Sequence, residues 1–410
     1  MKFYRWHQLP ELAAIYFSQS LSSRQLLELI TDIKHADREE AGDLPDLNTV
    51  LDQFEKLIRD IRLIFGRKDR RVNWQDIWDN TELSTELPRL LDAFQAVVDQ
   101  LDSINARGKL LDNCWQRAKA HYNYIEQYSE TRNEESIRWV EVRGQHIYLN
   151  QTPVNIAETF QQRLSVYNAS NIFTSASLAV NNNFNHFSRA LGLQQTTPHI
   201  WDSPFDYQRQ TRLYLPLDLP EPNHIDFFDA FINRCDTLLS YSQGRAFILF
   251  TSHRSLNQAS AILSGQLDYP LLIQGDAPRS ELLNQFRQTR HAVLLGTNSF
   301  WEGVDVKGEA LSLVIIEKLP FASPDDPVLQ ARLSYLQKQG GNPFMEYQVP
   351  QAAITLKQGI GRLIRDVDDR GVCVICDKRM VNKAYGKRLL KSLPPMPITH
   401  ELEDVKTFFN

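Results

Sequence analysis

The sequence lacks several features that mark particular classes of protein. No apolar run approaches the roughly 20 residues that span a bilayer, and the opening residues, M-K-F-Y-R-W-H, contain no apolar signal-peptide core. The net charge is -5, so no overall excess of basic residues indicates a nucleic-acid partner. We therefore expect a cytoplasmic protein without membrane contact, in which any nucleic-acid site is a local groove.

Cysteine is also scarce: the 410 residues include four, too few for a disulfide framework. Cys373 and Cys376 form a C-x-x-C pair inside the apolar run G-V-C-V-I-C-D. A zinc site needs two further ligands, and a redox pair normally lies at a helix N-terminus rather than in a strand. We predict a buried strand here and no metal site.

A third absence concerns nucleotides. The sequence contains no G-x-x-x-x-G-K followed by Ser or Thr, the loop whose backbone and lysine cradle phosphates. Two other stretches nevertheless have the character of a ligand site. Residues 294–308, L-L-G-T-N-S-F-W-E-G-V-D-V-K-G, run from an apolar strand into a Gly- and Ser-rich loop. The carboxyl end of a strand is where an α/β sheet places groups that face a ligand.

The second stretch, residues 358–366, reads Q-G-I-G-R-L-I-R-D. In helical geometry Gln358, Arg362 and Arg365 share one face at i, i+4 and i+7. Gly359 and Gly361 each cost a helix about 1 kcal/mol relative to Ala. Planar guanidinium groups suit phosphate, so the stretch predicts a helix that closely approaches an anion, the alternative being a structural arginine pair.

Apolar runs that alternate with helical patterns indicate the fold of the second half. The predicted strands are residues 244–250, 270–274, 292–295, 311–316 and 372–375, and residues 227–239 read as a helix. Such alternation predicts a parallel sheet covered on both faces.

The first part reads differently. Residues 8–130 carry three apolar stripes with helical spacing, which predict an all-helical region with its own core. From Ser136 the pattern alternates around Arg143-Gly144-Gln145 and predicts a hairpin. Thr152-Pro153 is expected to open a helix, and residues 171–178, N-I-F-T-S-A-S-L, to form a strand that ends in hydroxyl residues.

These stretches together resemble a known family. G-T-N-S-F-W-E-G-V-D is similar to motif V of superfamily 2 helicases and Q-G-I-G-R-L-I-R to motif VI, in the spelling of the DinG/YoaA branch of XPD-like ATP-dependent DNA helicases. Residues 171–178 resemble motif III, with Ser177 in place of a usual Thr, and residues 244–253 resemble motif IV.

Residues 7–13, H-Q-L-P-E-L-A, resemble the His and the six residues after it in the family's D-E-A-H-Q-L-P-E-L-A sequence. Tyr4, Arg5 and Trp6 then stand in the D-E-A places, so we expect a C-terminal part of such a helicase without Walker A and B motifs. The resemblance implies an α/β fold with a RecA-like second motor domain (196–400) and the closing part of a first (131–195). It also implies a helical arch-like region (1–130) and an acidic, aromatic tail (401–410).

The resemblance also implies site residues. Arg362 and Arg365 would be arginine fingers on ATP, with Gln358 beside them, and Glu302, Gly303 and Asp305 would couple the ATP cleft to the DNA groove. The DNA phosphates would meet hydroxyl and backbone groups, and motif III would supply three more hydroxyl residues. The former are Thr251, Ser252, Thr297 and Ser299, and the latter are Thr174, Ser175 and Ser177. Phe300 and Trp301 are expected to pack beneath the loop.

Two functions from different classes remain open. The first is an ATP-dependent DNA helicase that moves 5′ to 3′ on single-stranded or forked DNA, with ATP and Mg²⁺ as ligands. The iron–sulfur ligands of many relatives are not in this chain. The second is a non-hydrolysing remnant or accessory module that binds DNA or a replication or repair protein. Phe408 and Phe409 could dock such a protein, or could be buried on the second domain.

Overall fold

The computed structural model describes residues 8–40, 46–78, 80–104, 108–130, 136–166, 169–301 and 308–410. They form two compact units, which we describe separately. One unit contains residues 9–167 and 323–339, and the other contains residues 168–322 and 340–410. The predicted boundaries at 130 and 195 do not coincide with this division.

The unit formed by 168–322 and 340–410 is built on a parallel sheet. Every neighbouring pair of strands in it is parallel. In pairing order the strands are β11 (Ile398–Thr399), β5 (Thr211–Tyr214), β10 (Gly371–Ile375), β9 (Leu313–Ile316), β6 (Ala246–Leu249), β8 (Val293–Gly296) and β7 (Leu271–Ile273). The predicted α/β fold class and all five predicted strands are confirmed.

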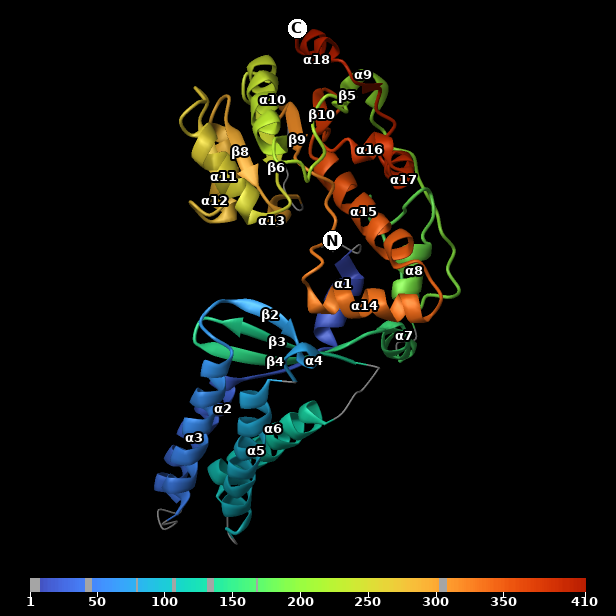
Figure 1. The fold of residues 1–410 in the computed structure, drawn as a ribbon. Helices are drawn as coiled ribbons and strands as arrows, with labels where there is room; N and C mark the ends of the chain where they lie inside the picture. The colour runs from blue at the N-terminus through green and yellow to red at the C-terminus, as the bar shows by residue number, and fades with distance from the viewer. Residues whose placement is uncertain are drawn as a thin grey trace. The chain divides into compact units, whose positions relative to one another are not determined.

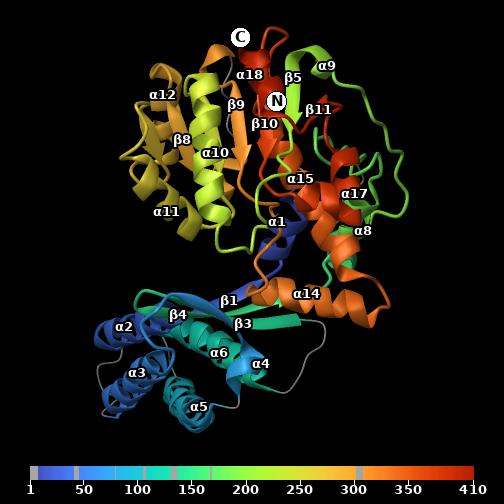
Figure 2. The same ribbon diagram turned by 45° about the horizontal axis from the view of Figure 1, so that its top comes forward.

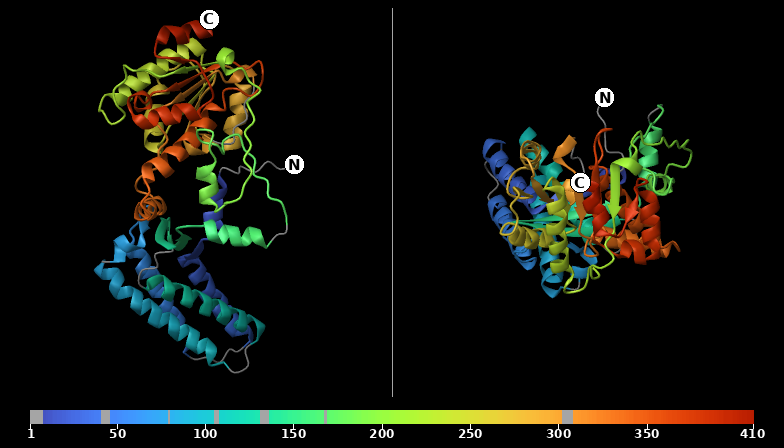
Figure 3. Two further views of the ribbon diagram at one scale, coloured as in Figure 1. Left: turned by 90° about the vertical axis from the view of Figure 1, so that its right-hand side faces the viewer. Right: turned by 90° about the horizontal axis from the view of Figure 1, so that it is seen from above.

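Helices cover both faces of this sheet (Figures 2 and 3). Strand β6 shows why, because its side chains are fully buried on both sides: Phe247 and Leu249 join one apolar cluster, and Ala246 and Ile248 join the other. On the Phe247 side lie α12 (Arg279–Gln288), α13 (Asn298–Trp301), α15 (Val349–Ile360) and α17 (Ala384–Ser392). On the Ile248 side lie α10 (Phe227–Ser242), α11 (His253–Leu263) and α18 (Leu402–Phe409).

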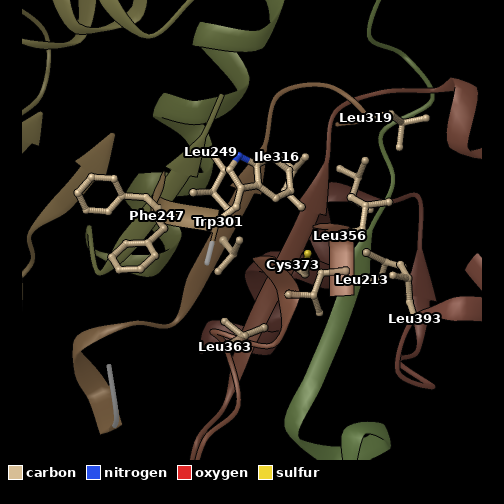
Figure 4. Close-up of a cluster of buried hydrophobic side chains, with 14 of the residues drawn as sticks. Leu213, Phe247, Leu249, Trp301, Ile316, Leu319, Leu356, Leu363, Cys373 and Leu393 are labelled. Atoms are coloured by element: carbon tan, nitrogen blue, oxygen red, sulfur yellow. The ribbon is translucent and has the colours of Figure 1, made fainter. Parts of the chain in front are cut away.

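The remaining short helices of this unit connect these layers. They are α8 (Asn185–Ala190), α9 (Tyr207–Gln210), α16 (Arg379–Asn382), the 3-10 turn η2 (Gly308–Ala310) and the π-helical turn η3 (Phe344–Gln348). Figure 4 shows the cluster on the Phe247 side, where Trp301 lies beside Leu249 and Ile316.

The unit formed by 9–167 and 323–339 packs long helices on one side of an antiparallel sheet (Figure 1). Its helices are α1 (Leu9–Tyr16), α2 (Ser23–Glu40), α3 (Leu47–Ile64), α4 (Trp74–Trp78), α5 (Thr81–Asp102), α6 (Lys109–Ser129), α7 (Ala157–Ser165) and α14 (Pro327–Lys338). The three predicted apolar stripes are the buried faces of α2, α3 and α5.

The antiparallel sheet departs from the expected all-helical region. Its strands pair in the order β1 (Gln19–Ser22), β4 (His146–Pro153), β3 (Ser136–Arg143) and β2 (Arg70–Asn73). The strands β1 and β2 have four residues each, too short for their alternation to stand out beside long helices. The predicted hairpin is confirmed as β3 and β4, with Gly144 in the turn at φ 54°.

Two predictions nearby are wrong. Thr152 and Pro153 do not open a helix but end β4, where they pair with Ile137 and Ser136. A proline is tolerated there because it stands at the end of the strand. Residues 171–178 do not form a strand, since no described strand lies beside them to complete a hydrogen-bonded ladder.

The C-terminal residues are not a free tail. Residues 402–409 form α18, in which Val405 is fully buried against the cluster that contains α10. Phe408 and Phe409 are partly buried there, and the guanidinium carbons of Arg212 and Arg370 lie 5.3 and 4.9 Å from the Phe408 ring centre. None of the helices in the described part of the chain combines the length and apolar character that a membrane span needs.

Burial of two histidines predicts how stability depends on pH. Desolvation lowers the pKa of His121, in α6, and of His186, in α8. The unfolded chain therefore takes up protons at these rings before the folded chain does, and stability is lost as pH falls from the unfolded value of 6.5 through the folded pKa values.

We expect the unfolding temperature to fall when the pH is lowered from about 7 to about 5.5, as measured by circular dichroism. Replacing His186 with Gln should flatten this decline, because it removes one of the two buried rings. A hydrogen bond from Arg234 lowers the pKa of Asp218, so its contribution is lost only below the unfolded value of 3.8. A melting temperature that rises between about pH 7 and 5.5 would contradict the lowered pKa values assigned to His121 and His186.

Candidate functional site

The hydroxyl residues expected at the ligand edge of the sheet do lie at carboxyl ends of strands. Thr251 and Ser252 follow β6 at the start of α11. The Ser252 hydroxyl caps this helix, because it accepts a hydrogen bond from the Ser255 amide at 3.0 Å. Ser252 is nevertheless exposed and Thr251 is half-buried, so both remain within reach of a ligand.

Thr297 follows β8 and is more enclosed, at 4% exposure. Its amide and its hydroxyl both donate to Oε1 of Gln274, at 2.7 and 3.1 Å. His253 Nε2 lies 3.4 Å from the same hydroxyl. The carboxyl ends of β6, β7 and β8 thus meet at Thr297, whose amide and hydroxyl both bind Gln274 and whose carbonyl accepts from the Phe300 amide.

The rest of motif V lies largely outside the described residues. Glu302, Gly303 and Asp305 fall in the range 302–307, for which no structure is described, and the Ser299 side chain is likewise not described. Phe300 and Trp301 are described, with exposures of 1% and 0%. The indole N–H of Trp301 donates to the Phe250 carbonyl at 3.2 Å. The two rings are therefore buried in the core of this unit.

Gly359 of motif VI lies against an aromatic ring. A Cβ on Gly359 would lie 2.9 Å from Cε3 of Trp301 and 3.3 Å from Cδ1 of Leu249. The absent side chain thus admits the Trp301 indole against α15, while the predicted approach to an anion stays a prediction. Gly361 is the C-cap of α15, where a Cβ would lie 2.9 Å from the Lys357 carbonyl oxygen.

The single helical face predicted for motif VI is wrong. Helix α15 ends at Ile360, so Gln358 lies in the helix while Arg362 and Arg365 follow it in irregular backbone. The helical spacing of the three residues is therefore not realised. Hydrogen bonds from the distant Gln210 and from Asp369 within the loop hold the backbone after Gly361 in a non-helical conformation.

The two arginines have different surroundings. Arg362 is 6% exposed, and its Nη2 donates to the Trp301 carbonyl oxygen at 2.8 Å. This bond joins motif VI to motif V across 61 residues of sequence. Arg365 is half-buried, and its backbone N–H donates to Asp369 Oδ2 at 2.7 Å. The structure thus separates a buried connecting arginine from a more accessible one.

Motif III contacts the motif VI helix. Ser177 is buried, and its hydroxyl lies 3.5 Å from Gln358 Nε2, while Thr174 and Ser175 are exposed. Lys357 donates from Nζ to the Ala179 carbonyl at 3.0 Å, and its burial lowers its pKa. Ser177 therefore lies beside Gln358, although the motif III segment is not a strand.

Three polar residues of this unit were not predicted from the sequence: Gln210 and Asp369 precede β5 and β10, and Asp377 follows β10. Asp369 and Gln210 hold the backbone of the loop that follows Arg362. Asp377, after β10, accepts from the Leu319 amide at 3.0 Å and from Arg379 Nη2 at 2.6 Å. Asp377 could have been noticed as the polar residue that ends a buried strand, whereas Asp and Gln at turns are too common to single out.

The cysteines behave as predicted. Cys373 lies within β10, Cys376 follows it, and both are fully buried. Desolvation raises the pKa of both thiols well above the usual range, so neither is a reactive thiolate. Across the residues that the structure describes, no group of His, Cys, Asp and Glu side chains could hold a metal ion.

Comparison with known proteins now identifies the relatives. Residues 235–396 match the family described as "Helicase C-terminal domain". The chain is 39% identical over 403 residues to the ATP-dependent DNA helicase YoaA of Haemophilus influenzae, covering 98% of this chain and 63% of that protein. It is 37% identical over 267 residues to the ATP-dependent helicase DinG of Mycobacterium tuberculosis, covering 63% of this chain and 40% of that protein.

The chain is homologous to the YoaA and DinG helicases over most of its length. It spans 63% of the length of the YoaA relative. A solved structure titled as an XPD helicase matches with a TM-score of 0.57 at 16% identity, over 96% of this chain and 67% of that structure. At this identity the match shows the fold, which is that of XPD helicases.

Proposed function

We propose that this chain carries the second motor domain of an ATP-dependent DNA helicase of the YoaA/DinG type. The observation that supports it most is the 2.8 Å hydrogen bond from Arg362 to the Trp301 carbonyl, which brings motif VI against motif V at the carboxyl edge of the sheet. In this proposal residues 196–400 form the second motor domain, residues 131–195 the closing part of a first, and residues 1–130 an arch-like region.

The residues fit one half of a nucleotide site. Arg365, more accessible than Arg362, is assigned as the arginine finger, the group that offsets the charge developed on the phosphates. Arg362 would hold the motif V backbone, and Gln358 would link the finger loop to Ser177 of motif III. Glu302, Gly303 and Asp305 keep their proposed coupling roles on resemblance alone.

The proposed DNA contacts use hydroxyl and backbone groups at strand ends. Thr251 and Ser252 stand at the N-terminus of α11, where backbone N–H groups favour an anion. Thr297 and Ser299 would bind the next phosphates through the motif V loop. Such a surface reads backbone rather than bases and suits sequence-independent binding to single strands. Movement from 5′ to 3′ is part of the proposal by family resemblance.

The 410 residues supply no phosphate-cradling loop and no Walker B carboxylates. ATP and Mg²⁺ would therefore meet mainly the half-buried guanidinium group of Arg365, and an ion pair at such a partly exposed position contributes about 0–1 kcal/mol. That does not offset the several kcal/mol needed to immobilise a ligand. For the 410 residues by themselves, this observation favours the second candidate function, a module that binds DNA or a protein without hydrolysing ATP.

The test is titration calorimetry of the 410-residue chain with ATP and Mg²⁺. We expect no turnover and no affinity tighter than roughly millimolar, about -4 kcal/mol. The comparison uses a second protein, the joined protein. In it the 410-residue chain is preceded by a first-motor segment, taken from a helicase of this family, that contains a phosphate loop and a D-E-A-H sequence. The joined protein should gain DNA-stimulated ATPase activity. Micromolar binding by the 410-residue chain would contradict the proposed division of the site.

A further inference from the structure

The loop from 361 to 370 carries both arginines but contains no regular element between α15 and β10. Backbone N–H and C=O groups in such a segment need partners other than a helix or a sheet. Two buried side chains from different parts of the chain supply them, Asp369 at 6% exposure and Gln210 at 7%.

The Asp369 carboxylate accepts three backbone hydrogen bonds. Its Oδ2 accepts from the amides of Arg365 at 2.7 Å and Asp366 at 2.8 Å. Its Oδ1 accepts from the amide of Gly308 at 3.0 Å. A carboxylate that accepts several N–H bonds holds its donors more firmly than neutral acceptors do. The backbone of Arg365 is thereby fixed to that of Gly308.

Gln210, the last residue of α9, binds the carbonyl oxygens of the same loop. Its Nε2 donates to the carbonyl oxygens of Asp366 at 3.1 Å, Val367 at 3.0 Å and Asp369 at 2.9 Å. Asp369 therefore orders the N–H groups of the loop and Gln210 orders its C=O groups. Together they determine where the Arg365 side chain leaves the backbone.

A local turn explains only part of this arrangement. An aspartate in a turn commonly accepts from amides a few residues away, as Asp369 does from Arg365 and Asp366. The bond to Gly308 spans 61 residues and serves no local turn. Gly308 lies three residues after motif V, at the start of η2, so one carboxylate connects the segment after motif V to the finger loop of motif VI.

We propose that Asp369 is a positioning residue, which fixes the backbone of the finger residue Arg365 relative to the segment that follows motif V. This inference rests on the proposed function, because it assigns no new reaction. It adds that the finger is set by a carboxylate four residues later, with Gln210 as its second support.

The first test uses the 410-residue chain and backbone amide hydrogen exchange followed by NMR. The substitution Asp369→Asn replaces one acceptor oxygen with an NH₂ group, which cannot accept from an amide. We expect faster exchange at Arg365, Asp366 and Gly308, with unchanged protection in β9 and β10. The exposed neighbour gives the matched control, Asp368→Asn, which should change none of these amides. Equal exchange in both variants would overturn the proposal.

The second test uses the joined protein. Asp369→Asn should lower kcat about 100-fold with little change in KM for ATP, the order of loss expected when a catalytic group is misplaced. Combining it with Arg365→Ala should cost no more than Arg365→Ala alone, because both changes remove the same interaction. If Asp369 had only a structural role, the kcat losses of the two substitutions would multiply in the double variant. That result would overturn the inference. An inactive joined protein with intact Asp369 would instead overturn the proposed function, and the exchange test would still decide the positioning.

Discussion

Replacing Arg365 with Ala in the joined protein should lower DNA-stimulated ATP turnover by about 10³-fold or more. That is the effect expected when the arginine that stabilises charge on a transferring phosphoryl group is lost. The melting temperature should stay nearly unchanged, since the Arg365 side chain is half-buried and the loop is held through its backbone. Steady-state kinetics at saturating DNA is the measurement.

Two other arginines make this experiment specific. Arg290 is exposed and precedes β8, which is separated from β10 by β9 and β6 in the sheet, so Arg290→Ala should leave turnover as it is. Arg362→Ala should lower turnover and also stability, because it leaves the buried Trp301 carbonyl without this donor, at a cost of about 1–3 kcal/mol. If Arg365→Ala kept full turnover, the arginine-finger assignment would be wrong.

Removing residues 405–410 should lower the melting temperature by about 10 °C. Val405 is fully buried and both phenylalanine rings are partly buried, which together contribute about 3–5 kcal/mol. In a unit of this size each kcal/mol shifts the melting temperature by about 2–4 °C. Differential scanning calorimetry measures the shift, and removal of Asn410 alone is the control that should leave it unchanged.

This outcome would decide between the two hypotheses for the C-terminal residues. Burial of Phe408 between Arg212 and Arg370 favours a structural role for α18. A docking role for a replication or repair protein predicts the reverse: loss of the partner in a pull-down with no change in melting temperature. An unchanged melting temperature would therefore count against the structural account.

The sequence predicted the sheet well because burial on both faces leaves continuous apolar runs. The run A-F-I-L of β6 has no polar position, and its two alternating sets of side chains enter two separate cores. Such apolar runs can be recognised as strands without knowing which strands they pair with. The helices α3 and α5 were also predictable, since a single apolar stripe decides their buried face.

Motif VI shows where such prediction fails. The spacing of Gln358, Arg362 and Arg365 fits a helix, but α15 ends at Ile360, and Gln210 from a distant segment binds the loop backbone that follows. The sequence also did not reveal that Gly359 lies against the ring of Trp301, 58 residues earlier. Both depend on contacts between distant segments, which local spacing does not encode.

The predictions for residues 152–160 and 171–178 were wrong for a related reason. Thr152 and Pro153 have the pattern of a helix start, yet the ladder with β3 continues to Ser136 and includes them in β4. Residues 171–178 have the composition of a strand, yet no described strand pairs with them. Pairing partners, not composition, decide both outcomes.

The measurement that tests the central claim most directly is ATP hydrolysis with and without single-stranded DNA, compared between the 410-residue chain and the joined protein. We expect no turnover by the 410-residue chain and DNA-stimulated turnover by the joined protein. The reason is that the proposed second motor domain supplies the arginine finger, whereas the phosphate loop comes from the first motor segment. DNA-stimulated turnover by the 410-residue chain, or none by a folded joined protein, would contradict this proposal.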